Sequence, residues 1–409
     1  MKKSIAALAV AGLFAGASMS AFAADAQVYG VLDTGLSFVH ADPDAAGRDA
    51  ADTFKMTTGQ EFGSRWGIRG SEDLGNGMKV GFILESGFES DTGSMEQNGR
   101  LFGREASLTL SGDFGALAVG RLPIFGSVLG ANGLFRAIDP LFANYTQAFG
   151  SGAVTASMWT RVDNAISYRT PTFSGFTGYA MYSFKNDSKT DTTNREGMAD
   201  SDRYASAAVR FQQGPVEAVL VADTTMYGNG RTVARAHDDA GVTVTLGGNY
   251  AFDGGVKLLA FGQYFEDQEL STAQRAGVVS AGLGALTNPV TGSAVQYGFV
   301  TGYGFNLGVH VPFMGGVAKA MAGHRDMHNE SDVDFKRTMA AVGYDYNLSK
   351  RTALYVMGGW SQEKVEVNAT KTDATPWGYE LTAGMVHRKR YCMTAPRSMT
   401  GTPSSTAVR

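Results

Sequence analysis

The chain has 409 residues, of which 53 are glycine, 10 are proline and 11% are aromatic. This composition favours many turns and half-apolar segments, so it argues against a helical bundle and for an all-β protein. The formal net charge of -4 comes from 35 basic and 39 acidic residues in short mixed groups, and without a long basic run a nucleic-acid partner is excluded.

Residues 1–23 are expected to be a signal peptide. Lys2 and Lys3 precede an apolar stretch from Ile5 to about Ala17, and Ala21-Phe22-Ala23 supplies a cleavage site of small residues. The apolar stretch is too short to be a membrane-spanning helix, and no later segment reaches about 18 uninterrupted apolar residues. The mature chain is therefore predicted to be exported without a transmembrane helix. The single cysteine, Cys392, excludes an intramolecular disulfide framework.

Seven short turn signals recur along the mature chain, each between two segments of strand character. Seven short turns predict eight hairpins and sixteen antiparallel strands. The signals are Leu74 to Gly77, Gly112 to Gly115, Pro171 to Gly175, Gln213 to Pro215, Asp253 to Gly255, Pro312 to Gly316 and Leu348 to Lys350.

The predicted strands alternate apolar and polar side chains, as a membrane barrel requires. Between Met78 and Phe88, most even positions are apolar, whereas Lys79 and Glu85 lie among the odd ones. Trp66 and Ile68 alternate with Arg65, Gly67 and Arg69 in the preceding strand in the same way. One face then suits lipid and the other suits water.

A soluble β-sandwich also alternates, but the connections favour a closed barrel. Short turns alternate with long polar connections, predicted at His40 to Gln60, Glu89 to Arg100, Asn186 to Asp202 and Asp267 to Gln296. Such asymmetry is typical of periplasmic turns and extracellular loops. Closure also pairs every backbone amide within lipid. We therefore predict a transmembrane antiparallel β-barrel over residues 24–388.

The chain resembles the general porins of Gram-negative bacteria, in particular the neisserial-type branch of β-proteobacteria. The matching segments occur in the family's order over nearly all of the mature chain. They are Gln27 to Asp33, Gly63 to Gly77, Gly115 to Arg121, Ile166 to Arg169 and Gly384 to Arg388. The resemblance implies location in the outer membrane, contact with lipid and lipopolysaccharide, and a homotrimer.

The family also implies a third loop that folds inward to narrow the pore, and Leu122 to Thr160 is the long insertion at that place. Its many apolar residues favour an inward fold over an external loop. Family members carry basic wall residues opposite acidic residues on this loop. Matched residue by residue, the basic wall is Arg65, Arg69, Arg104 and Arg169, and the loop acid is Asp139.

A positive balance in a narrow pore predicts mild anion preference. The leading hypothesis is a passive, water-filled channel for ions and small hydrophilic solutes. Two alternatives remain open: a surface-exposed binding or adhesion protein that uses its long loops, and a solute-specific channel. For the basic wall, the alternative interpretation is that the arginines do not set selectivity and merely neutralise nearby loop acids.

No enzyme motif, cofactor or metal site is predicted. Six scattered histidines offer no hydrolase arrangement. Gly59 to Gly77 lacks the Lys-Ser/Thr ending of a phosphate loop. His324 and His328 flank Asp326, but the spacing alone is weak evidence for a metal, and a strand end that enters a solvated external loop is the favoured interpretation.

The C-terminal segment departs from the family. Family barrels end on an aromatic residue, whereas Lys389 follows Arg388 here and 21 residues run to Arg409 without a strand pattern. A frameshift or other artefact is favoured over a natural periplasmic extension. We expect residues 389–409 to be disordered and this chain to assemble poorly. Efficient recovery of trimers from outer membranes with an untrimmed tail would contradict this prediction.

Overall fold

The computed structural model describes most of the chain between residues 26 and 388. The described residues are 26–45, 47–141, 146–156, 160–231, 237–270, 278–279, 286, 292 and 294–388. The predicted signal peptide and the C-terminal segment 389–409 lie outside these residues. In the described part of the chain, no helix is both long and apolar enough to cross a membrane.

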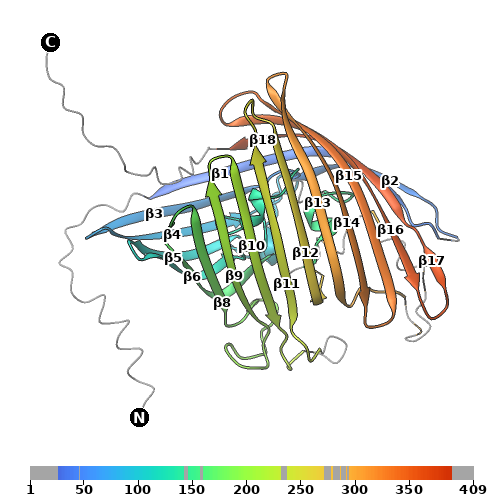
Figure 1. The fold of residues 1–409 in the computed structure, drawn as a ribbon, viewed down its shortest axis with the longest axis horizontal. Coiled ribbons are helices and arrows are strands. Elements are labelled where there is room, and N and C mark those ends of the chain that lie inside the picture. Colours follow the sequence, from blue (N-terminus) through green and yellow to red (C-terminus); the bar gives the residue numbers. More distant parts are fainter. Residues whose placement is uncertain are drawn as a thin grey trace.

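The described strands form one closed antiparallel sheet (Figure 1). The strands are β1 (Gln27–Asp42), β2 (Ala51–Thr58), β3 (Arg65–Gly75), β4 (Met78–Gly87), β5 (Glu105–Gly112), β6 (Gly115–Pro123), β7 (Arg161–Arg169), β8 (Phe176–Ser183), β9 (Arg203–Gln213), β10 (Val216–Met226), β11 (Gly241–Ala251), β12 (Lys257–Glu269), β13 (Phe299–Phe313), β14 (Gly316–Asn329), β15 (Val333–Asn347), β16 (Thr352–Val367), β17 (Thr372–Ala374) and β18 (Trp377–Arg388). Short helical segments are α2 (Glu96–Gly99), η1 (Leu134–Ala137) and η2 (Ser151–Val154).

These 18 segments make sixteen barrel strands, as predicted. Both β2 and β3 pair with β1, and both β17 and β18 pair with β16, so each couple is one interrupted strand of the wall. The barrel closes where β1 pairs with β18, with Val31 opposite Arg388 and Asp42 opposite Trp377. All seven predicted turns join neighbouring strands.

The predicted loop from His40 to Gln60 is wrong over most of its length. β1 continues to Asp42 and β2 begins at Ala51, and the ladder pairs Phe38 with Phe54. The many polar residues of this stretch hide the alternation that marks a strand. The strands form because they pair with each other across the hairpin. The connection itself covers only residues 43–50.

The alternation of side chains separates the two faces of the wall. On β11, Leu246 is 62% exposed whereas its neighbour Thr245 is fully buried, and on β15 Val342 is 62% exposed next to the buried Ala341. Because the exposed positions are apolar, they form the lipid-facing surface of a membrane barrel. Polar and small residues point inward, together with the apolar side chains of the wall that loop 3 covers.

The connection between β6 and β7, residues 124–160 and here called loop 3, lies against the inner wall. Phe135 stacks on Phe261 of β12 with ring centroids 6.3 Å apart, and Phe125 packs edge-on against Tyr179 of β8 at 5.4 Å. The amide of Asn249 on β11 donates to the Ala137 carbonyl oxygen at 2.6 Å. The described apolar residues of loop 3 are thus packed inside the barrel. Phe142 lies outside the described residues.

Glycines on the inner wall allow this close packing. A Cβ atom at Gly304 of β13 would collide with the carbonyl oxygen of Val154, and one at Gly308 would collide with the Pro140 ring. Glycine is required at both positions because loop 3 occupies the space that any side chain would fill.

A buried ion cluster holds the end of loop 3. On β16, the Glu363 carboxylate accepts from Arg325 of β14 and Arg337 of β15, each at 3.0 Å, and these three side chains are at most 2% exposed. Arg325 also donates to the Thr155 carbonyl oxygen at 3.2 Å. The cluster therefore connects three strands to the loop.

Substituting Gly304→Val should push the Val154 segment off the wall and into the lumen. We expect lower single-channel conductance with more current noise, measured in planar bilayers. Gly262→Val is the matched control, because a Cβ at Gly262 meets no atom within 4 Å. Equal conductance of the two variants would contradict the packing described.

Substituting Glu363→Gln should destabilise the barrel by about 3–5 kcal/mol, because two buried guanidinium groups lose their counter-ion. Urea unfolding in detergent micelles measures this change. The control is Glu366→Gln on the same strand, whose pair with the half-exposed Lys364 contributes little. A similar small loss in both variants would show that the cluster does not stabilise the fold.

Candidate functional site

The inner wall of β1, β3 and β4 carries a group of charged side chains centred on Glu85. Arg104, directly before β5, donates from Nε to Glu85 Oε1 at 2.7 Å, and Arg65 Nε lies 3.6 Å from Oε2. The Tyr29 hydroxyl donates to the same Oε2 at 2.9 Å. We call Tyr29, Arg65, Glu85 and Arg104 the Glu85 cluster.

Strand register explains why these residues meet. Arg65 pairs with Gly87, and Trp66 pairs with Ser86. Glu85 is two residues from Gly87 along β4, which is one dyad step, so Arg65 and Glu85 are neighbours on the same inward face. The backbone amide of Arg104 donates to the Glu85 carbonyl oxygen at 3.1 Å, which places its side chain beside the carboxylate. The sequence alternation around Arg104 did not predict this position.

Arg69 lies four residues, or two dyad steps, from Arg65 on the same face, nearer the end of the barrel that carries the short turns. Its guanidinium donates from Nε and Nη2 to Gln27 Oε1, at 3.3 and 2.9 Å, and lies 5.7 Å from the centre of the Tyr29 ring. Tyr29 therefore contacts both Arg69 and Glu85.

Arg169 is not brought to this cluster. It is the last residue of β7, exposed at the end of the barrel that carries the short turns, opposite Ala116 and Tyr179. The arginine at the other end of β7 takes that place: Arg161 is buried and donates from Nε to the Arg104 carbonyl oxygen at 2.7 Å. Sequence reasoning missed Arg161, since no alternation marked it.

Two more arginines that sequence reasoning missed as site residues lie beside the cluster. Arg100 and Arg121 both contact the Asp163 carboxylate, and Arg100 also pairs with Asp187 in the loop after β8. Burial raises the pKa of Asp187, but hydrogen bonds from the Thr190 amide and from Arg100 outweigh it and lower this pKa below its ordinary value. Asp187 is thus ionised at neutral pH.

Asp139 of loop 3 is buried, with 4% of its surface exposed. Its carboxylate accepts from the Ser151 hydroxyl at 2.6 Å, and Ser151 in turn accepts from Asn306 at 3.1 Å. Arg136, three residues earlier, is exposed and donates to the Val128 carbonyl oxygen. Loop 3 therefore offers water a basic side chain at this place.

His324, Asp326 and His328 lie in the last part of β14, which ends at Asn329, so the segment is a strand end and the loop begins only after these residues. His324 bonds to Thr338 at 2.9 Å, and Asp326 pairs with Lys336 at 3.6 Å. Pairing with β15 continues through His328, opposite Asp334, which explains the strand.

Comparison with known proteins agrees with this architecture. A family model described as Gram-negative porin matches residues 6–365. An outer membrane porin of Bordetella pertussis is 32% identical over 92% of this chain and 99% of its own length, and outer membrane porin protein 32 of Delftia acidovorans is 32% identical over 87% and 88%. The solved anion-selective porin from Comamonas acidovorans is 26% identical, with a TM-score of 0.63 over 90% of this chain and 100% of its own. The chain therefore belongs to the Gram-negative porin family and is an outer-membrane channel, not an enzyme.

Proposed function

We propose that the channel passes ions and small hydrophilic solutes passively, with a mild preference for anions, between loop 3 and the Glu85 cluster. The described part of loop 3 covers the inner wall from β8 to β18, as its contact with Tyr179 and the hydrogen bond from the Ala148 amide to Glu380 show. The Glu85 cluster lies on the facing wall of β1, β3 and β4, and loop 3 approaches its edge where Gly130 lies near Glu105. Water-filled space is thus expected along the arginines.

The balance of charge on this wall supports the anion preference. Within the network of ion pairs and hydrogen bonds around the Glu85 cluster, six arginines stand beside five carboxylates, so one positive charge remains in this network. The arginines are Arg65, Arg69, Arg100, Arg104, Arg121 and Arg161, and the acids are Glu85, Glu96, Glu105, Asp163 and Asp187.

The burial of the Asp139 carboxylate is the single observation that carries the proposal. A loop acid facing the arginines would cancel the positive field of the wall, but this carboxylate is buried against Ser151 while Arg136 is exposed. Fixed charges in a narrow, low-dielectric passage attract the opposite ion. The similar Comamonas acidovorans protein is itself described as anion-selective.

The chain is further proposed to act as a homotrimer in contact with lipid and lipopolysaccharide. Large apolar side chains remain exposed on outward positions of many strands, among them Leu246, Val342 and Leu381. One solved barrel with the same fold, OmpT of Vibrio cholerae, is described in a trimer form. Chemical cross-linking in the outer membrane should give a three-chain product, and recovery of single chains alone would argue against it.

The other functions remain testable alternatives. A steady ohmic conductance in planar bilayers supports the diffusion channel, and a closed barrel favours a binding or adhesion protein. Conductance that saturates with one solute would indicate a solute-specific channel.

Substituting Arg65→Ala should shift the reversal potential in a salt gradient toward cations, because Glu85 then keeps only Arg104 and the wall loses its excess positive charge. Glu85→Gln should shift it in the opposite direction. The control is Arg195→Ala, since Arg195 lies in the loop after β8 with a side chain 72% exposed. If Arg65→Ala leaves selectivity unchanged, the arginines serve only to neutralise acids.

A further inference from the structure

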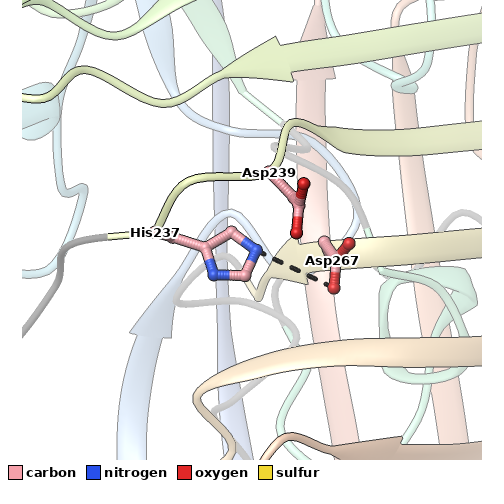
Figure 2. A group of neighbouring side chains, drawn as sticks. All are labelled: His237, Asp239 and Asp267. Atoms are coloured by element: carbon pink, nitrogen blue, oxygen red, sulfur yellow. Dashed lines mark ion pairs between the residues drawn. The ribbon is translucent and has the colours of Figure 1, made fainter.

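A separate group of ionisable side chains lies at the loop end of the barrel. His237 and Asp239 belong to the connection between β10 and β11, and Asp267 lies near the end of β12 (Figure 2). One ligand atom from each of the three lies within 4.8 Å of the others. The proposed function does not use this group.

The His237 ring is buried, and one of its nitrogens lacks a hydrogen bond. The side chain is only 6% exposed, because the ring stacks on Phe299 with centroids 3.9 Å apart and meets the edge of Tyr227. Among the described residues, Nε2 has no hydrogen-bond partner. It points toward Asp267, whose Oδ1 lies 3.8 Å away (Figure 2). A buried polar atom left without a partner is destabilising unless something binds it.

The other ring nitrogen of His237 faces a carboxylate. Nδ1 lies 3.3 Å from Glu330 Oε1, in the turn between β14 and β15. A carboxylate at one nitrogen holds the proton there and leaves the lone pair of the other nitrogen free, as is common for histidines that bind metals. Glu330 thus prepares Nε2 as a ligand.

A β-bulge directs Asp267 toward His237. The register of β12 and β13 shifts between Phe265 and Gln268, and Asp267 has a φ of 49°. The Tyr227 hydroxyl donates to the Asp267 carbonyl oxygen at 3.0 Å, and the Asp267 amide donates to Thr301 at 3.1 Å. Bulges re-aim side chains, and here the backbone is held in a sparsely populated conformation.

The nearby cation is already engaged by other acids. Arg231 pairs with Asp202 and Glu269 and stacks over the Tyr227 ring at 4.4 Å. Burial opposes its charge, but these carboxylates outweigh burial and raise the pKa of Arg231. Among the described residues, Asp239 has no ion pair with a basic side chain and Asp267 has only His237. Their charge is available to a cation.

We propose that His237 Nε2, Asp239 and Asp267 bind a divalent transition-metal ion, with Zn²⁺ the best match, and that Glu330 is a positioning residue. One imidazole and two carboxylates leave a fourth position for water, which suits Zn²⁺. Ca²⁺ and Mg²⁺ prefer sets made only of oxygen ligands. The ion would tie the connection after β10 to the end of β12 and, through Glu330, to the turn after β14.

Isothermal titration of the full-length protein in detergent with ZnCl₂ tests the site. Cys392→Ser serves as the parent, because a thiolate is itself a zinc ligand. One bound ion is expected. His237→Asn and Asp239→Asn should each weaken binding at least about tenfold, and Glu330→Gln by roughly ten- to a hundredfold. The matched control is His328→Asn on β14, which should keep the parent affinity.

Two results would overturn the site. One is a parent that takes up no Zn²⁺, and the other is an affinity unchanged by His237→Asn. Excess Ca²⁺ should leave Zn²⁺ binding unaffected, and equal competition by Ca²⁺ would exclude the transition-metal assignment. Heat-modifiable migration on gels confirms that each variant is folded, and because the ligands lie at the loop end, we expect it to be retained.

Discussion

The hydrogen bonds of the backbone are the constraint on which the structure depends. Lipid offers no partners, so each amide and carbonyl group within it needs one inside the sheet. β1 meets this need by pairing with β18 on one side and with β2 and β3 on the other. Where the ladder breaks between β2 and β3, the buried Asp33 carboxylate accepts from the amides of Glu61 and Phe62. The interruption therefore leaves no donor unpaired at these two residues.

Closure of the barrel creates an inner wall with two different halves. On one half, glycines let loop 3 approach the strands, and aromatic stacking and the Glu363 ion cluster hold it there. On the other half, arginines and acids remain in a network around Glu85. Hydrophobic packing thus decides the position of the loop, whereas fixed charge decides which ions favour the remaining space. This division follows from the low dielectric of the packed half, where a buried charge needs a counter-ion or hydrogen bonds.

The surroundings of a residue, more than its type, decide its role in this barrel. Asp139 and Glu85 are both carboxylates near the lumen, but the first is bound by Ser151 and the second by two arginines. His324 and His237 are both histidines of the loop half. His324 shares a cross-strand hydrogen bond with Thr338, whereas His237 is buried and its Nε2, which has no hydrogen-bond partner in the described part of the chain, faces an acid. Pore chemistry and metal-binding chemistry are thereby kept on separate parts of the molecule.

Much of the fold was predictable from the sequence, because the signals that carry it are local. A dyad period in side-chain polarity and the chemistry of tight turns act within a few residues, and they gave the seven turns, the sixteen strands and the inward side of Arg65 and Arg69. The packing of loop 3 followed from its apolar composition together with a family resemblance. The polar stretch from His40 to Gln60 was misread because its pairing partners, not its own pattern, make it a hairpin.

The charged sites needed the tertiary structure, since register and bulges bring together residues that are distant in sequence. Arg161 and Arg169 lie at opposite ends of one nine-residue strand, about 26 Å apart, and only the register shows which of them meets Arg104. His237, Asp267 and Glu330 come from three separate segments and meet through the bulge in β12. By itself the sequence determined a porin-type barrel with basic side chains on its inner face. The fold decided which of those charges act together, because contacts between strands depend on a register that no single segment encodes.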